Sequence, residues 1–292
     1  MNPTAAIHNG LSWESYFAMP ALSSTGARTM LNKSPFHARY RDAKEDMTKA
    51  QEVGRAVHML VLEPALFAAQ YRVYTKPKGT GMKAALAEIE NQALADGVEL
   101  IEADDMAEVE SMRQSLWSCA TLRDYLGRAN LEQSITWIDE ETGCPCKARL
   151  DIRVEDQDGR QVIIDLKSCR EAGPDAFSKA IHRYGYHIQA AFYMEAGRAA
   201  GFDPKEFLFV AQEKPSASKL TLAPPPMIYR LDAGDVAIGL LKVREAMRIY
   251  MDCQRRNFWP CYQDGGPAVV DISLPAYAYT QDDEEVDYDG LS

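Results

Sequence analysis

Three β-rich runs, separated by two turn signals, constrain the fold of this chain more than any other feature. They cover residues 134–139, 146–154 and 161–167, and the turns between them are Glu-Thr-Gly at 141–143 and Asp-Gln-Asp-Gly at 156–159. Short connections rich in Gly and Asp typically join antiparallel neighbours in a sheet. We therefore predict a three-stranded antiparallel meander in the middle of the chain.

Helical patterns surround this meander. Apolar residues recur every three to four positions, and prolines at Pro35 and Pro64 stop the first two helices. The expected helices span 21–34, 49–62, 82–95, 104–118, 174–184, 187–200 and 235–255, and further strands span 206–212 and 226–231. This order predicts an α/β fold in which helices flank a mixed central β-sheet.

The chain is expected to form one domain with a tail. We place the domain at 1–256, with a helical part at about 20–126 and a sheet-containing part at about 130–256. Residues 257–292 are rich in Pro, Gly and acids, and we expect a flexible tail there.

Several classes of protein are disfavoured by what the sequence lacks. No glycine-rich phosphate loop follows a strand, which argues against Rossmann and P-loop domains. The six cysteines form no Cys-x-x-Cys pair, so we expect reduced thiols and no iron–sulfur cluster. No apolar run approaches the roughly 18 residues of a membrane span, and the first residues do not resemble a secretory signal. We therefore expect a cytoplasmic protein without membrane contact.

The net charge of −11 does not exclude a protein that acts on DNA. Six acids lie within residues 282–289 alone, and acids that bind a metal ion are offset by its charge. The distribution of charge matters more than the total.

The residues most suggestive of chemistry lie in the second and third β-rich runs. A hairpin can bring Asp151 and Asp165, which we expect to end its strand, to one end of a sheet, where two carboxylates suit Mg²⁺ or Mn²⁺. Because strand side chains alternate, Lys167 shares a face with Asp165 and can orient a nucleophilic water. Asp-x-Lys occurs three times, but only here does it follow a strongly apolar strand. The alternative is a charged pair on a solvated strand end.

Two helices offer further candidates. His58 lies in an apolar helix, where a histidine is more often a hydrogen-bonded core residue than a metal ligand or phosphate contact. Gly54, one turn earlier, would allow another backbone to approach closely. Gln189 and Tyr193 share a helical face and could donate hydrogen bonds to a phosphate; otherwise they are ordinary half-buried helix surface.

Taken in order, these motifs resemble a known family. Gly54-x-x-x-His58, an acid, Asp165-x-Lys167 and Gln189-x-x-x-Tyr193 follow one another as in the PD-(D/E)-x-K superfamily of nucleases. The sequence is most similar to the branch with exodeoxyribonuclease VIII (RecE type), lambda exonuclease and the RecB nuclease domain. The stretch at 142–151, Thr-Gly-Cys-Pro-Cys-Lys-Ala-Arg-Leu-Asp, is especially like the RecE-type exonucleases of prophages. The resemblance covers about 20–255 and implies a restriction-endonuclease-like core.

The resemblance also implies roles for residues. Lys167 would be the catalytic lysine, with Gln189 and Tyr193 beside it. The metal ligands would be side chains and one carbonyl, namely His58, Asp151, Asp165, Leu166 and Glu132. Glu132 matches an acid that some members place near the metal, and Glu63 is a competing candidate.

Basic residues near the N-terminus form a candidate DNA-facing patch, whose alternative is a solvated helix face. Arg28, Lys33 and Arg149 are our predicted DNA contacts, and Arg28 is the candidate for a 5′-terminal phosphate.

Function follows from the resemblance as an expectation. It implies a Mg²⁺-dependent exodeoxyribonuclease, with Mn²⁺ as a possible substitute, that resects linear double-stranded DNA 5′→3′ and leaves 3′ single strands for annealing-type recombination. It also implies a ring-shaped homo-oligomer on DNA ends and cooperation with a single-strand annealing protein.

Three rival hypotheses stay open. The same core could act as an endonuclease or a single-strand exonuclease. The chain could be a catalytically inert DNA-binding relative. It could also be an unrelated metal-dependent hydrolase of a small phosphate ester, which would require a closed pocket.

Overall fold

The structure is a computed structural model that describes residues 4–41, 48–263, 266 and 269–275. Its strands are β1 (Ala6–His8), β2 (Tyr71–Tyr74), β3 (Glu99–Glu102), β4 (Asn130–Ile138), β5 (Pro145–Glu155), β6 (Gln161–Cys169), β7 (Pro204–Glu213) and β8 (Met227–Arg230). Its α-helices are α1 (Trp13–Ala18), α2 (Ser24–Asn32), α3 (Pro35–Arg39), α4 (Lys49–Leu62), α5 (Pro64–Gln70), α6 (Met82–Asp96), α7 (Ala103–Ser118), α8 (Ala120–Leu126), α9 (Pro174–Tyr184), α10 (Tyr186–Ala199) and α11 (Ala233–Arg256). A short 3₁₀ turn, η1 (Pro215–Ser218), follows β7.

The central sheet is mixed, as predicted. Its strand order is β1-β4-β5-β6-β7-β8, with β6 and β7 parallel and the other neighbours antiparallel. The β4–β5–β6 meander matches the prediction, and its turns contain Gly143 and Gly159 at φ of +69° and +77°, a conformation that favours glycine. A separate parallel pair, β2 and β3, was not expected from the sequence.

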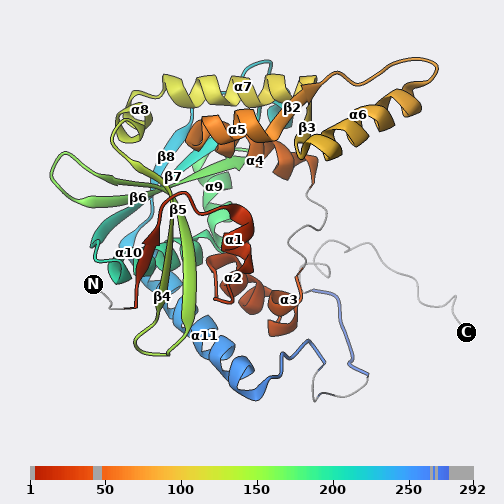
Figure 1. Ribbon diagram of the computed structural model, residues 1–292. Helices are drawn as coiled ribbons and strands as arrows, with labels where there is room; N and C mark the ends of the chain where they lie inside the picture. The colour runs from red at the N-terminus through yellow and green to blue at the C-terminus, as the bar shows by residue number, and fades with distance from the viewer. Residues whose placement is uncertain (1–3, 42–47, 264–265, 267–268, 276–292) are drawn as a thin grey trace, which may run out of the picture.

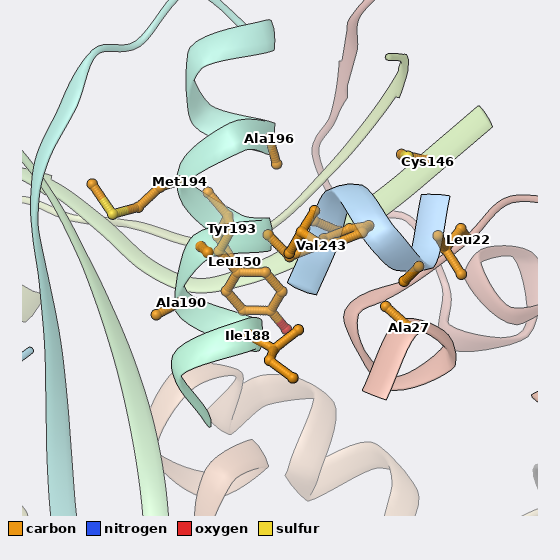
Figure 2. Close-up of a cluster of buried hydrophobic side chains, with 14 of the residues drawn as sticks. Leu22, Ala27, Cys146, Leu150, Ile188, Ala190, Tyr193, Met194, Ala196 and Val243 are labelled. Carbon is orange, nitrogen blue, oxygen red and sulfur yellow. The ribbon is translucent and has the colours of Figure 1, made fainter. Parts of the chain in front are cut away.

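Helices cover both faces of this sheet (Figure 1). Buried side chains of α4, α5, α7 and α8 form one apolar cluster with the sheet. Those of α2, α9, α10 and α11 form a second cluster on the other face. Figure 2 shows part of the second cluster, where α10 presents Ile188, Tyr193 and Ala196. The sheet is therefore the middle of three layers, and its polar side chains can be reached only where a strand or helix leaves a gap.

Local signals account for the helix that matters most to the site. Thr48 and Gln51 form a capping box at the start of α4, and the helix ends at Leu62 because Glu63 precedes a proline. Both ends agree with the predicted span. The first predicted helix, 21–34, corresponds to the shorter α2, and Pro35 begins a separate helix, α3, that was not predicted.

One strand differs from the prediction in a way that affects the site. The sequence predicts that Asp165 ends its strand, but β6 continues to Cys169 because β7 pairs with it in parallel along its length. No helix in the described part of the chain is long and apolar enough to span a membrane. Most of the acidic tail, including residues 282–289, lies outside the described residues.

Candidate active site

The site forms where two neighbouring strands separate. The antiparallel register of β5 and β6 begins at Glu155 and Gln161 and runs to Ile152 and Ile164. One residue further along β5, the carboxylate of Asp151 accepts a hydrogen bond from the main-chain N–H of Leu166 at 2.9 Å. The Asp151 side chain, and not a main-chain carbonyl of β5, is therefore the acceptor for this N–H of β6. This places the Asp151 carboxylate at β6, beside Asp165.

The histidine of α4 reaches two carboxylates at this opening. Its Nε2 lies 2.8 Å from Oδ2 of Asp151, and its Nδ1 lies 3.3 Å from Oε1 of Glu132. Burial alone would lower the pKa of His58, but the carboxylates of Asp151 and Glu132 outweigh burial and raise this pKa to about 9. The same pairing holds the pKa of Asp151 below its usual range, although burial acts to raise it. We call His58, Glu132 and Asp151 the acid–histidine cluster.

Glu132 is the unusual member of this cluster. Its side chain is only 6% exposed, and its backbone has a φ of +49°, which is costly for a residue with a Cβ. Within the described part of the chain, neither of its carboxylate oxygens accepts a hydrogen bond. Burial raises the pKa of Glu132 to about 8. A buried carboxylate whose oxygens accept no hydrogen bond has acceptors available to a cation.

The donor set of the acid–histidine cluster fits a divalent cation. One atom from each of its three residues lies within 4.8 Å of the others. Carboxylate oxygens with an imidazole nitrogen suit Mn²⁺, and carboxylates alone suit Mg²⁺. The unsatisfied oxygens of Glu132 supply acceptors that no protein donor uses among the described residues. The metal-binding roles of these side chains stay predictions.

Asp165 lies beside the cluster with partners of its own. It is 1% exposed, forms an ion pair with Lys167, and accepts a hydrogen bond from Gln189 on α10 at 2.7 Å. Burial raises its pKa to about 6, against the opposing effect of Lys167. The ammonium of Lys167 also lies 4.9 Å from the ring centre of Tyr186. The alternation of β6 and the face of α10 thus bring together the Asp-x-Lys and Gln-x-x-x-Tyr motifs.

Tyr193 has a different environment from Gln189. Its ring lies in the apolar cluster between α10 and the sheet (Figure 2). Burial, followed by the charges of Asp151 and Asp165, raises its pKa well above the ordinary value. The phenol therefore stays neutral and is close enough to the acids to feel their charge.

Gly54 explains how α4 comes so near the sheet, with one correction. A Cβ at this position would lie 2.4 Å from Oγ of Ser168, closer than atoms can approach. The sequence suggests that another backbone approaches this glycine, but the close neighbour is a side chain of β6. The glycine lets α4 carry His58 to the opening between the strands.

The predicted DNA contacts do not share one environment. Lys33 is exposed at the end of α2. Arg28 is half-buried and donates to the carbonyl of Tyr184 at 3.0 Å and to Thr25 at 3.3 Å. Arg149 is only 4% exposed, which leaves little of its guanidinium for contact with DNA.

Other candidates lie apart from the site. The Asp203–Lys205 pair is a solvated ion pair with both side chains more than half exposed, and the pair at 42–44 lies outside the described residues. Glu63 caps the end of α4 and is not part of the acid–histidine cluster. Sequence reasoning missed Tyr186 and the inward direction of Lys147. The alternation of Lys-x-Arg-x-Asp along β5 was a usable signal for the latter, because it places all three side chains on one face.

Comparisons with known proteins bear on the family and the fold of this chain. The family described as "PDDEXK-like domain of unknown function (DUF3799)" matches residues 27–266. No curated protein matches the sequence. The crystal structure of a "putative exonuclease" from Eubacterium rectale is similar at a TM-score of 0.57 and 15% identity, over 94% of this chain and 99% of that one. A phage related exonuclease from Haemophilus somnus 129PT gives a TM-score of 0.37 and 13% identity, over 82% of this chain and 97% of that one, too low to carry an argument. The predicted fold class is confirmed.

Proposed function

Because this chain belongs to the family of PDDEXK-like domains of unknown function (DUF3799), we propose that it is a metal-dependent deoxyribonuclease. The family and the fold support a nuclease in general. The finer proposal is a 5′→3′ exonuclease that resects linear double-stranded DNA and leaves 3′ single strands. The observation that carries the metal-dependent chemistry is the acid–histidine cluster, which lies beside an aspartate–lysine pair and whose buried Glu132 oxygens accept no hydrogen bond among the described residues. The direction of resection rests on the sequence resemblance.

The residues of the site have two kinds of proposed role: some would bind the metal ion, and others would orient the reacting groups. His58, Glu132 and Asp151 would hold a divalent cation, Mg²⁺ or Mn²⁺, with Asp165 and the Leu166 carbonyl as the remaining predicted ligands. When bound, such a cation supplies positive charge to the phosphate and lowers the pKa of water.

The lysine has a separate task. Asp165 and the face of Tyr186 hold the Lys167 ammonium in place, so it can donate to a nucleophilic water or to a phosphate oxygen without first losing conformational freedom. Gln189 fixes the direction of the Asp165 carboxylate by its hydrogen bond. Tyr193 sits one helical turn further along α10 as a neutral phenol.

Contacts with DNA are part of the same proposal. Arg28 and Lys33 would contact the backbone, with Arg28 as the contact for a 5′-terminal phosphate. Recombination of phage or prophage DNA, a ring-shaped homo-oligomer and a single-strand annealing partner complete the proposal, and they rest on the sequence resemblance alone.

The test is degradation of linear duplex DNA labelled at the 5′ or the 3′ end, in Mg²⁺, Mn²⁺ and EDTA. We expect early release of the 5′ label with either cation, none in EDTA, and no cleavage of closed circles. Lys167→Ala should abolish release, while Lys205→Ala, which removes the lysine of the solvated Asp-x-Lys pair, should leave it unchanged. Cleavage of circles would indicate an endonuclease. DNA binding without cleavage would support an inert relative.

A further inference from the structure

Two buried cations on β5 have no part in the proposed chemistry. Lys147 and Arg149 alternate with Asp151, so all three side chains lie on one face of the strand. They are 6% and 4% exposed. Buried cations need partners that replace water. Most of those partners lie in an N-terminal segment, residues 11–19, which precedes the family match at 27–266.

Lys147 is an anchor for this segment. Its ammonium donates to the carbonyls of Tyr16 at 2.8 Å, Phe17 at 3.2 Å and Met19 at 2.7 Å. An ammonium has three donors, and all three are used. The Lys147 side chain therefore fastens the end of α1 to the sheet.

Arg149 holds the same segment but also faces the site. Its guanidinium donates to the carbonyl of Leu11 and lies 4.0 Å from the ring centre of Trp13. Its Nε donates to Ser134 at 2.9 Å and lies 3.9 Å from Oε2 of Glu132. Two ladder pairs between β1 and β4, Ile7–Ile135 and His8–Ser134, keep the incoming chain beside this point.

We infer that Arg149 is a positioning residue for Glu132 and that residues 11–19 hold it in place. Glu132 lies between His58 on one side and Arg149 on the other. With a metal ion bound on the His58 side, Arg149 is a fixed positive charge on the other side of the buried carboxylate. It compensates the charge of Glu132 and fixes the direction of an acid whose backbone is strained.

The inference depends on the proposed function in one respect, that the acid–histidine cluster binds a cation.

Lys147 provides the matched control, because it holds the same segment without reaching Glu132. We would measure Mn²⁺ affinity by calorimetry for wild type, Arg149→Met, Arg149→Lys and Lys147→Met. Loss of a residue that supports a metal ligand typically weakens binding about 10–100-fold. We expect that loss in Arg149→Met, a several-fold loss in Arg149→Lys because lysine lacks the planar fork, and less than a twofold change in Lys147→Met.

The same variants are then combined with Glu132→Gln. The Arg149→Met effect on Mn²⁺ affinity should largely disappear in that background, because its target is already gone. Equal losses in Arg149→Met and Lys147→Met would overturn the inference, since loosening the segment would then be sufficient. So would an Arg149→Met loss that persists in Glu132→Gln.

A second cycle does not depend on the metal. Urea unfolding in EDTA should show non-additive midpoint shifts for Arg149→Met and Glu132→Gln, because the two side chains face each other. Additive shifts would overturn the inference. If wild type binds no Mn²⁺ while the unfolding cycle is non-additive, the proposed function fails and the positioning role stands. If Arg149→Met does not fold, Arg149→Lys replaces it in both double-mutant comparisons, Mn²⁺ binding and urea unfolding.

Discussion

Two clusters of acids and a cation lie at opposite ends of β4, and the pKa of the buried acid is lowered in one and raised in the other. In the first, Arg244 of α11 pairs with Asp139 and, at 2.6 Å, with Glu195. Asp139 also accepts hydrogen bonds from the N–H of Thr142 at 2.9 Å and from its hydroxyl at 2.7 Å. Burial would raise the pKa of Asp139, but Thr142 and Arg244 together lower it.

The acid–histidine cluster is the contrasting case. Glu132 faces two cations, yet its oxygens accept no hydrogen bond within the described residues and its pKa rises to about 8. Every acceptor of a structural ion cluster is used, whereas a ligand site keeps acceptors free for its ligand. We therefore expect the Arg244 cluster to stabilise the folded state. The acid–histidine cluster should destabilise the metal-free fold, because its acceptors are left without hydrogen bonds.

The largest effect that separates the clusters is expected from Glu132→Gln. Nuclease activity should fall on the order of 100-fold, because one negative ligand is lost where charge matters most. The free energy of unfolding in EDTA at pH 7 should not fall, because Glu132 with a pKa near 8 is mostly protonated there and Gln mimics that form. Initial rates and urea unfolding check both statements. The control is Glu63→Gln, which should retain wild-type rates; a comparable loss there would move the ligand role to Glu63.

Asp139→Asn should show the reverse behaviour. It breaks a buried ion pair with Arg244, whose side chain is 22% exposed, and we expect a loss of about 2 kcal/mol in the free energy of unfolding. Activity per folded molecule should not change. Asp252→Asn, which affects exposed pairs with Arg255 and Arg256, should leave the free energy of unfolding nearly unchanged. A loss of activity without a loss of stability in Asp139→Asn would erase the distinction between the clusters.

Gly54→Ala should affect both properties at once. Its Cβ would collide with Oγ of Ser168, so the serine side chain must rotate or α4 must shift, and we expect a cost of about 1–2 kcal/mol. Because a shift of α4 moves His58, we also expect weaker Mn²⁺ binding by calorimetry. Gly26→Ala is the control, since its Cβ would meet two side-chain ends at longer distances, Cδ1 of Leu22 at 3.3 Å and Oγ of Ser23 at 3.5 Å. Unchanged Mn²⁺ binding in a destabilised Gly54→Ala would show that His58 does not depend on the position of α4.

The smallest effect concerns pH. The folded-state pKa values of His58, Glu132 and Asp165 are raised to about 9, 8 and 6. The metal-free folded protein then binds more protons than the unfolded chain, so its stability should fall as pH rises from about 5 to 9. We expect a decrease of a few degrees in the midpoint of thermal unfolding in EDTA.

Two comparisons sharpen that result. Mn²⁺ should flatten the pH dependence, because a bound cation takes the place of the protons. Glu132→Gln should reduce the slope, whereas Asp139→Asn should not, since the lowered pKa of Asp139 lies below this window. A midpoint that rises with pH in EDTA would contradict the assignment of raised pKa values to the acid–histidine cluster.

Much of the fold could be predicted from the sequence because its signals are local. The capping box and Glu63-Pro64 set the ends of α4, and two glycine-containing turns set the β4–β5–β6 meander. The order of the motifs along those elements was also sufficient to expect Asp151, Asp165 and Lys167 near one another. Periodicity and turn chemistry depend on residues only a few positions apart.

The rest depended on partners far away in the chain. The parallel partner of β6 lies about 40 residues further along, and it moves Asp165 from the end of a strand to its interior. The segment 11–19 turns Arg149 from an expected DNA contact into a buried side chain. Which polar side chain loses its water is decided by whatever packs over it, and that neighbour is not encoded in local sequence.

The sequence by itself determined the main elements that carry the site, the residue types at the site and the face of each strand on which they lie. Only the tertiary structure decided that β5 and β6 separate at Asp151, that α4 brings His58 to two carboxylates, and that Glu132 is left with unsatisfied oxygens. The reason is physical: alternation and helical period follow from the geometry of the backbone, whereas charge compensation depends on distances between groups that only packing of the whole chain brings together.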